Sequence, residues 1–185
     1  ITQKTTIMKK IWLTCLVAAL SFTSFSQKIQ MTVDGSKQGN FKGDDNETKI
    51  KLLSYLQEIS APRDASGMAT GRTQAQPVTI VKQTGASSPQ FLMALATNEM
   101  LKTVTIEFLA INANGEEYVD YVVTLRNVVL SSFKQKTEVS INEKSGSRFT
   151  NTSNMLQDEI RLSYQTIEVE SKSGKTMAVY SANIR

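Results

Sequence analysis

Apolar and polar residues alternate along most of the chain after residue 27, and this period of two is typical of half-buried β-strands. The clearest runs cover residues 29–33, 104–110, 119–126 and 160–164. Each run places one face in a core and the other toward water or a partner. Shorter strands are predicted at Lys49–Ile59, Pro77–Gln83 and Thr176–Ile184.

The last clear run changes phase before it ends. Ile167 and Val169 continue the strand pattern, but they are out of step with the run 160–164. An extra residue in one strand of a pair produces such a shift. We therefore predict a β-bulge near Gln165-Thr166.

One segment has helical rather than strand periodicity. Ser88 can cap a helix there, and Pro89 suits the first turn, where its missing N–H is not needed. Asn98 suits the C-terminal end. The apolar stripe that we expect to pack against a sheet consists of Phe91, Leu92 and Leu95.

Two long segments lack periodicity and are predicted to be mobile loops. Ala61–Gln76 is rich in Gly, Ala and Thr, and Asn142–Asn154 is polar. About seven strands, one helix and a long loop between early strands indicate a mainly β protein. We expect two packed antiparallel sheets that form a small barrel with one short helix.

The start of the chain is typical of an export signal. Met8 is followed by two lysines and by an apolar run, Ile11–Leu20, that is too short to span a bilayer. Small residues then precede a predicted cleavage between Ser26 and Gln27. We expect residues 1–26 to be removed and residues 27–185 to form one exported domain, periplasmic or extracellular, without stable membrane insertion.

Two other interpretations of this segment are weaker. A buried N-terminal strand or helix would not require the order of positive, apolar and small residues. A lipid anchor on Cys15 would require a longer apolar run in front of it. Residues before Met8 are interpreted as upstream translation.

Composition narrows the chemistry further. The chain has 185 residues and no histidine, and its single cysteine, Cys15, and single tryptophan, Trp12, lie in the expected signal. Histidine triads, His or Cys metal sites and thiol nucleophiles are therefore excluded. Removal of the signal takes away three lysines and no acid, which lowers the net charge from +4 to +1. A near-neutral domain gives no indication of nucleic-acid binding.

One segment has a spacing similar to that of a calcium-binding loop. The matching positions are Asp34, Ser36, Gln38, Gly39 and Asp45. The last of them should be a long bidentate Glu, Lys42 stands where a ligand is expected, and the flanks are predicted strands rather than helices. A polar turn between strands is therefore the favoured interpretation, with no metal.

Other candidate groups give no catalytic pattern. Glu116-Glu117 and Asp44-Asp45 are adjacent acids, and neighbours on one strand point to opposite faces. Asn114-Gly115 beside the first pair predicts a hairpin turn. The serine pairs Ser87-Ser88 and Ser131-Ser132 have no histidine to activate them. A Ser-Lys arrangement with Lys102 or Lys134 is possible, but no spacing favours it. We predict no enzyme activity and no cofactor.

The order of elements carries the more specific signal. Val81–Leu109 contains the end of a strand, a Ser-Pro helix start, a short helix and a further strand. Val128–Ser132 ends in small polar residues, and Glu159–Glu170 is a late strand with a phase shift. Over most of Ile29–Glu170 this order resembles the Hcp family, the tube proteins of type VI secretion systems.

The resemblance implies a small barrel of two sheets that assembles as a homohexameric ring. Rings of the family stack into a tube that is propelled with its effectors, so the implied role is structural. The loop Ala61–Gln76 corresponds in order to the family's extended loop, which contacts neighbouring subunits or rings. We expect this contact to involve Arg63, Asp64, Met68 and Arg72; a disordered loop is the alternative.

The expected signal sets this chain apart, because tube-building members of the family assemble in the cytoplasm. Fold does not carry function by itself. The alternative function is therefore an exported monomeric β-domain that acts as a secreted binding module. Few aromatic residues remain after cleavage, which weakens a glycan-binding interpretation. A serine- or metal-dependent enzyme ranks third.

Overall fold

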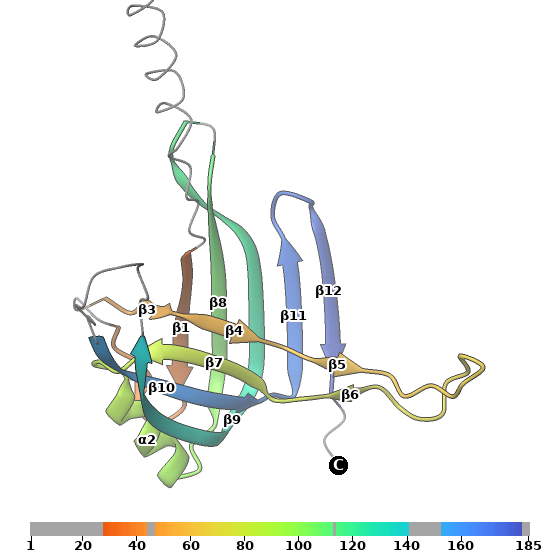
Figure 1. Cartoon of the computed structure of the whole chain (residues 1–185), viewed down its shortest axis with the longest axis horizontal. Helices are drawn as coiled ribbons and strands as arrows, with labels where there is room; N and C mark the ends of the chain where they lie inside the picture. Colours follow the sequence, from red (N-terminus) through yellow and green to blue (C-terminus); the bar gives the residue numbers. More distant parts are fainter. Residues whose placement is uncertain (1–27, 44–46, 113, 141–152, 183–185) are drawn as a thin grey trace, which may run out of the picture.

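The computed structural model describes residues 28–43, 47–112, 114–140 and 153–182 (Figure 1). Within these residues there is one helix, α2 (Ser88–Ala96), which lies between β7 and β8. The strands in chain order are β1 (Lys28–Gly35), β2 (Gly39–Asn40), β3 (Ile50–Leu52), β4 (Ser54–Leu56), β5 (Ile59–Ser60), β6 (Gln74–Ala75), β7 (Val78–Gln83), β8 (Leu101–Ile111), β9 (Glu117–Ser140), β10 (Ser153–Ser163), β11 (Thr166–Ser171) and β12 (Thr176–Ser181). The mainly β class with one short helix is confirmed. The expected signal and its cleavage site at Ser26 and Gln27 lie outside the described residues, as does most of the predicted loop Asn142–Asn154.

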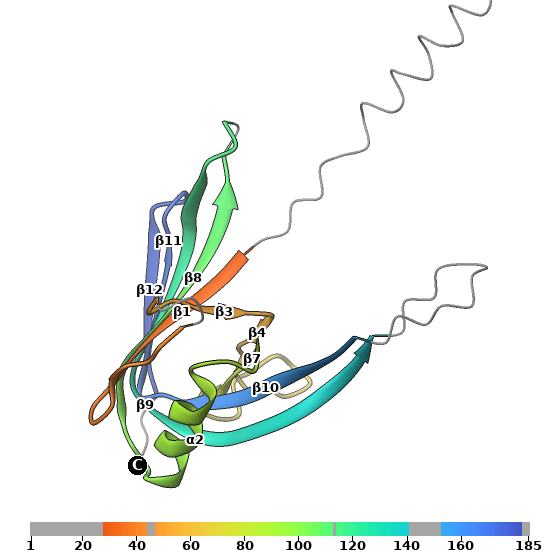
Figure 2. The same cartoon turned by 90° about the vertical axis from the view of Figure 1, so that its left-hand side faces the viewer.

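Two antiparallel sheets share the long strand β9. In the first sheet, β8 pairs with β1 on one side and with the first half of β9 on the other, and β11 and β12 follow. In the second sheet, the later half of β9 pairs with β10, followed by β7 and β4. Figure 2 shows the two sheets diverging from the bend in β9.

The bend in β9 lies at Asn127, whose φ is 52°. Asparagine adopts this left-handed conformation more readily than most residues. Its Nδ2 donates a hydrogen bond of 2.6 Å to Oε1 of Gln165, and the Gln165 N–H donates to the carbonyl of Arg126 at 3.2 Å. The chain therefore turns the same corner twice, at Asn127 and again at Gln165.

The return of the chain past this corner at Gln165 explains the phase change in the late strand. β10 ends at Ser163 in the second sheet, and β11 begins at Thr166 in the first sheet. Tyr164 and Ile167 are both buried, one on each side of the corner. The predicted bulge near Gln165-Thr166 is therefore wrong in kind: the shift arises from a break between two strands in different sheets.

The two sheets do not close into the predicted barrel. On the side away from β9 they are joined by β3, which pairs with β1, and β4, which pairs with β7. Leu53 lies between these short strands, and its N–H donates to the carbonyl of Val81 at 2.7 Å. Because each strand pairs over only three residues, the link does not form a continuous ladder around the molecule.

The core lies between the inner faces of the two sheets, and α2 covers one end of it. Phe91 of α2 packs edge-on against Phe41, with ring centroids 5.0 Å apart. Leu92 is exposed and Leu95 is half-buried, so the predicted apolar stripe is only partly buried. The buried strand residues include Met31, Val33, Ile50, Val78, Ile80, Val104, Ile106, Val123, Leu125, Ile160 and Leu162.

The apolar inner face of the second sheet ends at a polar row. Gln135, Asp158 and Lys82 lie directly opposite one another on β9, β10 and β7. Lys82 Nζ lies 3.0 Å from Asp158 Oδ2, and the two side chains are 1% and 0% exposed. Thr84 Oγ1 and Gln135 Nε2 donate to the other carboxylate oxygen at 2.7 and 2.9 Å.

Ser88, at the start of α2, completes this network. Its hydroxyl donates to Asp158 and accepts hydrogen bonds from Lys82 Nζ at 2.9 Å and from the Gly85 N–H at 3.0 Å. The third proton of the Lys82 ammonium goes to the carbonyl of Gln83 at 2.8 Å. The predicted role of Ser88 as the helix cap is wrong, since Ser87 holds the cap position without a side-chain hydrogen bond.

The hydrogen bonds also control the ionisation of Asp158. Burial alone raises the pKa of this carboxyl group, but the bonds from Ser88, Thr84, Gln135 and Lys82 outweigh burial and leave the pKa below its usual value. The carboxylate is therefore the form that the folded chain stabilises.

We predict that Asp158→Asn destabilises the fold by about 3–5 kcal/mol at neutral pH, because it leaves Lys82 buried without a counter-charge. The pKa of Asp158 is lower in the folded chain than in the unfolded chain. The stability that the ionised carboxylate gives the fold is therefore complete above the ordinary aspartate pKa of about 3.9, and it is lost as the pH falls through the lowered pKa. Urea unfolding at decreasing pH should show a smaller loss of stability in the variant than in the parent. Glu159→Gln, on the outer face of the same strand, is the control. An unchanged acid dependence in Asp158→Asn would contradict the assignment.

Candidate functional site

A projecting arm, residues 57–76, is the most distinctive surface feature. β5 and β6 pair within it, with Ile59 opposite Ala75 and Ser60 opposite Gln74. The Gln76 N–H donates to the carbonyl of Glu58 at 3.0 Å and closes the base. Figure 1 shows the arm extending sideways beyond both sheets. The segment predicted as a mobile loop is therefore a short two-stranded hairpin, and hydrogen bonds hold its tip in shape.

The tip of the arm is organised by Asp64. Its Oδ1 accepts hydrogen bonds from the Ser66 N–H at 2.9 Å, the Ser66 hydroxyl at 2.6 Å and the Met68 N–H at 2.9 Å. These bonds lower the pKa of Asp64, with the Ser66 hydroxyl as the largest cause. Arg63 Nη1 donates to the carbonyl of Gly67 at 2.9 Å, and Gly67 has the positive φ of 84° that the tight turn requires.

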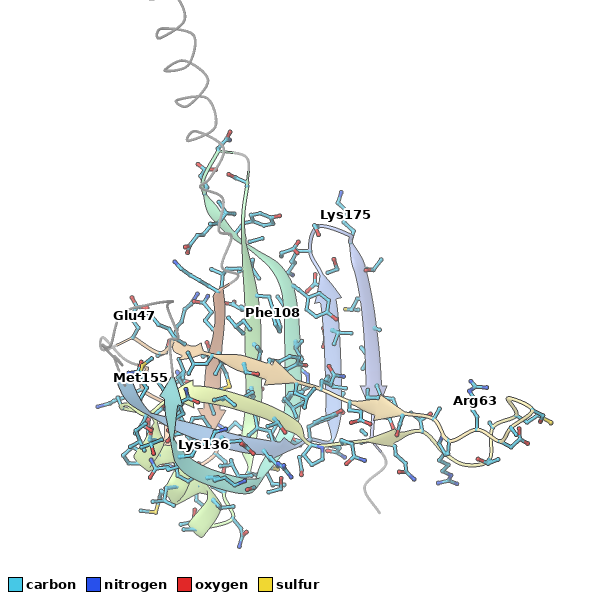
Figure 3. The ribbon with its side chains drawn as sticks, in the orientation of Figure 1. Glu47, Arg63, Phe108, Lys136, Met155 and Lys175 are labelled. Atoms are coloured by element: carbon cyan, nitrogen blue, oxygen red, sulfur yellow. The ribbon has the colours of Figure 1, made fainter. Side chains whose placement is uncertain are left out.

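The four residues predicted as a contact are thus brought to one arm. Arg63 and Asp64 shape its tip, Met68 is 69% exposed at the turn, and Arg72 is exposed on the returning strand. Figure 3 shows Arg63 well away from the sheets. Hydrogen bonds from two tyrosines of the body reach the arm: the Tyr180 hydroxyl donates to the Thr73 carbonyl at 3.2 Å, and the Tyr55 hydroxyl donates to Gln57 Oε1 at 2.7 Å. An ordered hairpin that buries almost none of its own surface has the properties of a contact segment.

A second surface feature is the free edge of β12. This strand pairs only with β11 among the described residues, so the other side of its backbone is open. None of its six residues is charged, and Met177 and Val179 are 65% and 57% exposed. Monomeric proteins usually protect such edges with charges, proline or a bulge. An unprotected edge indicates pairing with another strand.

Exposed apolar side chains also occur elsewhere on the described surface. Several lie on the arm and the link before it, on or just after α2, and at the ends of β8 and β9 that flank their turn. The residues are Leu53, Leu56, Ile59 and Met68; Leu92, Met93 and Met100; and Ile111 and Tyr118. Others lie on the second sheet, at Val129, Met155 and Leu156.

The cavities at the base of the arm carry no catalytic constellation. One of about 280 Å³ is lined by Ala75, Gln76, Pro77, Ser163, Tyr164 and Ala182, and one of about 400 Å³ by Leu56, Glu58, Gln76, Pro77, Thr79 and Arg161. Burial is the largest cause of a raised pKa for the Tyr164 hydroxyl, which has no hydrogen-bond partner. Among the described residues no three metal-ligating side chains cluster, and no helix is long and apolar enough to cross a membrane.

The segment with calcium-loop spacing forms the turn between β1 and β2. Glu99, which follows α2, inserts its carboxylate into this turn: Oε1 accepts the N–H groups of Lys37 and Gln38 at 2.6 and 2.9 Å. Burial raises the pKa of Glu99, but these bonds and the Gln38 amide outweigh it and lower the pKa. A Cβ on Gly35 would lie 2.7 Å from Oε1. Asp34, Ser36, Gln38 and Gly39 therefore build the polar turn, and Asp45 lies outside the described residues.

The remaining candidate groups have structural partners. Asn112 organises the turn at Asn114-Gly115 by accepting the Asn114 and Glu116 N–H groups at 2.9 and 3.0 Å. Glu117 forms an ion pair with Lys28. Ser131 donates to the Arg161 carbonyl at 3.2 Å.

Only one of the four serines considered meets a lysine in the described structure, and the pairing is Ser88 with Lys82. Lys102 and Lys134 were the lysines that the sequence offered for a Ser-Lys pair, but they lie near Asp34 and Glu159 instead. Both members of the Ser88–Lys82 pair are buried, and Lys82 is held by Asp158. A substrate has no access to the hydroxyl, and the lysine has no free lone pair to act as a base. Asp44 and Asp45 are outside the described residues.

Comparison with known sequences identifies the family. The profile of the family described as "Type VI secretion system effector, Hcp" matches residues 29–170, which is most of the chain. The "Major exported protein" of Pseudomonas aeruginosa is 28% identical over 118 residues, which cover 56% of this chain and 69% of that protein.

Solved structures of Hcp proteins have a similar fold. A crystal structure of an Hcp protein superposes with a TM-score of 0.73 at 16% identity, covering 85% of this chain and all of the other. The secreted protein Hcp3 of Pseudomonas aeruginosa gives 0.66 at 20% identity, with 86% of this chain and all of Hcp3 covered. Hcp1 of Flavobacterium johnsoniae gives 0.55 at 14% identity, with 84% and 99% covered. The chain belongs to the Hcp family of type VI secretion proteins, a structural family rather than a family of enzymes.

Proposed function

We propose that this chain is a ring-forming structural subunit of the Hcp type, which assembles as a homohexamer whose rings stack and carry effectors. The observation that carries the proposal is the arm, which is ordered, projects from the body and exposes Met68 at its tip. Holding a hairpin in one conformation costs chain entropy, and the arm recovers little of it within its own chain. A second copy would supply the missing contacts.

The arm and the β12 edge are two different surfaces of the chain, which allows the head-to-tail contact that a ring requires. The arm leaves the molecule from the link between β4 and β7, whereas the open edge belongs to the first sheet. A projecting arm that enters a different surface of the next copy makes a heterologous contact, and such contacts close into a ring when the rotation divides a full turn. The uncharged edge of β12 gives the next copy a backbone to pair with.

Export is the second part of the proposal. The pattern of residues 1–26 is that of a signal peptide, with cleavage between Ser26 and Gln27, and the relative from Pseudomonas aeruginosa is named as an exported protein. We infer that the domain acts in the periplasm or outside the cell, with copies of itself and secreted effectors as its partners. An exported ring would then work apart from the cytoplasmic tube of the family.

Light scattering combined with negative-stain imaging of purified Gln27–Arg185 tests assembly. We predict closed rings of about six subunits, the number that the family resemblance implies, because a heterologous contact closes into a ring when its rotation divides a full turn. A stable monomer at high micromolar concentration would contradict the ring. That result would favour the exported binding module instead, with the cavities at the base of the arm as its first candidate site.

A charge reversal on the arm tests the predicted contact. Arg72→Glu should weaken assembly by about tenfold or more, since a repulsive charge at a subunit contact costs on the order of a few kcal/mol. Lys42→Glu makes the same charge change on an exposed side chain that belongs neither to the arm nor to β12, and it serves as the control. The concentration at which rings dissociate is measured for both variants. Equal dissociation of the two variants and the parent would remove the arm from the contact.

Met68→Asp extends the same test to the apolar tip. The side chain is exposed in the single chain, so the fold should be unaffected and circular dichroism should match the parent. Rings should dissociate at higher concentration than in the parent, because a buried aspartate would replace an apolar contact.

A further inference from the structure

The buried network of Lys82, Asp158 and Ser88 has a property that core packing does not require. All three ammonium protons of Lys82 have acceptors, which are the Gln83 carbonyl, Ser88 Oγ and Asp158 Oδ2. Asp158 accepts two bonds on each oxygen, and Ser88 donates once and accepts twice. The set is therefore fully satisfied, which is the condition under which buried polar groups are tolerated.

Stability alone does not explain why these groups are charged. A buried ion pair can often be replaced by apolar residues of similar volume without loss of stability, because desolvation offsets the attraction. The neighbouring row on the same inner face is apolar, with Phe133, Ile160 and Ile80 directly opposite one another. An apolar row at Gln135, Asp158 and Lys82 would extend that core under α2.

The row that contains Asp158 and Lys82 distinguishes the native alignment of β7 and β10 from shifted alignments. A shift of β7 by one residue against β10 would turn the apolar face outward. A shift by two residues keeps the faces correct and would place Ile160 opposite Lys82 and Leu162 opposite Ile80. The apolar residues of the two strands are similar enough to pack in this shifted register. Lys82 and Asp158, however, would no longer lie opposite each other, and each charge would be buried without the other.

We propose that the Lys82–Asp158–Ser88 network is a register lock for the second sheet, which selects one alignment of β7 and β10 and fixes the start of α2 against them. Ser88 couples the two tasks, since it is the first residue of α2 and bonds to both charged groups. The lock acts through the cost of burying an unpaired charge in the shifted register. It does not depend on ring formation, because all its members lie in one chain.

Paired cysteines report the register directly. Thr79 and Arg161 are directly opposite each other on the outer face, so Thr79→Cys with Arg161→Cys reports the native register. Val81 is opposite Glu159, so Val81→Cys with Arg161→Cys reports a shift by two residues. Both pairs are made in the full chain with Cys15→Ser, which removes the natural cysteine. Peptide mapping by mass spectrometry after mild oxidation quantifies each disulfide.

The lock is removed with Lys82→Met, Asp158→Val and Ser88→Ala together, which replaces the two charged members of the row with apolar side chains and removes the hydroxyl between them. Thr84 and Gln135 lose an acceptor in this variant but are accessible to water. A matched control changes Lys134→Gln and Glu159→Gln, an ion pair of 3.8 Å directly across β9 and β10 on the outer face of the same sheet.

In the parent and the matched control, we expect only the native disulfide, with the shifted one at least about tenfold slower, because the unpaired charges disfavour the shifted register. The variant without the lock should fold, with strand content unchanged in circular dichroism, and should form both disulfides. Formation of the native disulfide alone in that variant would overturn the proposal, because other features would then set the register. Failure of that variant to fold would also overturn it, because the network would then be needed for stability and not for alignment.

Discussion

The structure depends on one strand that belongs to two sheets. β9 is 24 residues long; its first half pairs with β8 and β11, and its second half pairs with β10. The left-handed conformation of Asn127 turns the strand between these partners, and Gln165 holds the bend from the returning chain. In the part of the chain that the structure describes, the short strands β3 and β4 join the sheets on the side away from this corner, and β12 pairs on one side alone.

In this architecture the interior is closely packed, whereas parts of the surface lack partners. The inner faces bury an apolar core, and where the core ends the charges of Lys82 and Asp158 are paired and fully hydrogen-bonded. The surface differs: the edge of β12 is uncharged and open, and the arm is ordered with Met68 in water. These features are the basis of the proposal that the chain associates with copies of itself, and they agree with membership of a structural secretion family.

Sequence periodicity predicted the strands and the helix well, because the period of two and the Ser-Pro helix start are local signals. It did not predict how the sheets are joined. The phase change before Ile167 was visible, but a bulge and a corner between two sheets give the same local pattern. The roles of Glu99 and Asp158 were missed because their partners, Gln38 for one and Lys82 and Ser88 for the other, are distant in sequence. Only an acid within an otherwise apolar strand pattern could have drawn attention to Asp158. Arg63, Asp64, Met68 and Arg72 were placed on one segment, but the hairpin that Asp64 builds there was not predicted.

We propose that copies of this chain associate through the open edge of β12. Hydrogen exchange of the backbone amides of residues 176–181, measured above and below the concentration at which the protein associates, tests this pairing. We expect the outward-facing amides to exchange much more slowly in the associated state, because they acquire acceptors from the neighbouring copy, whereas those bonded to β11 change little. Equal exchange of the outward-facing amides in both states would contradict the claim.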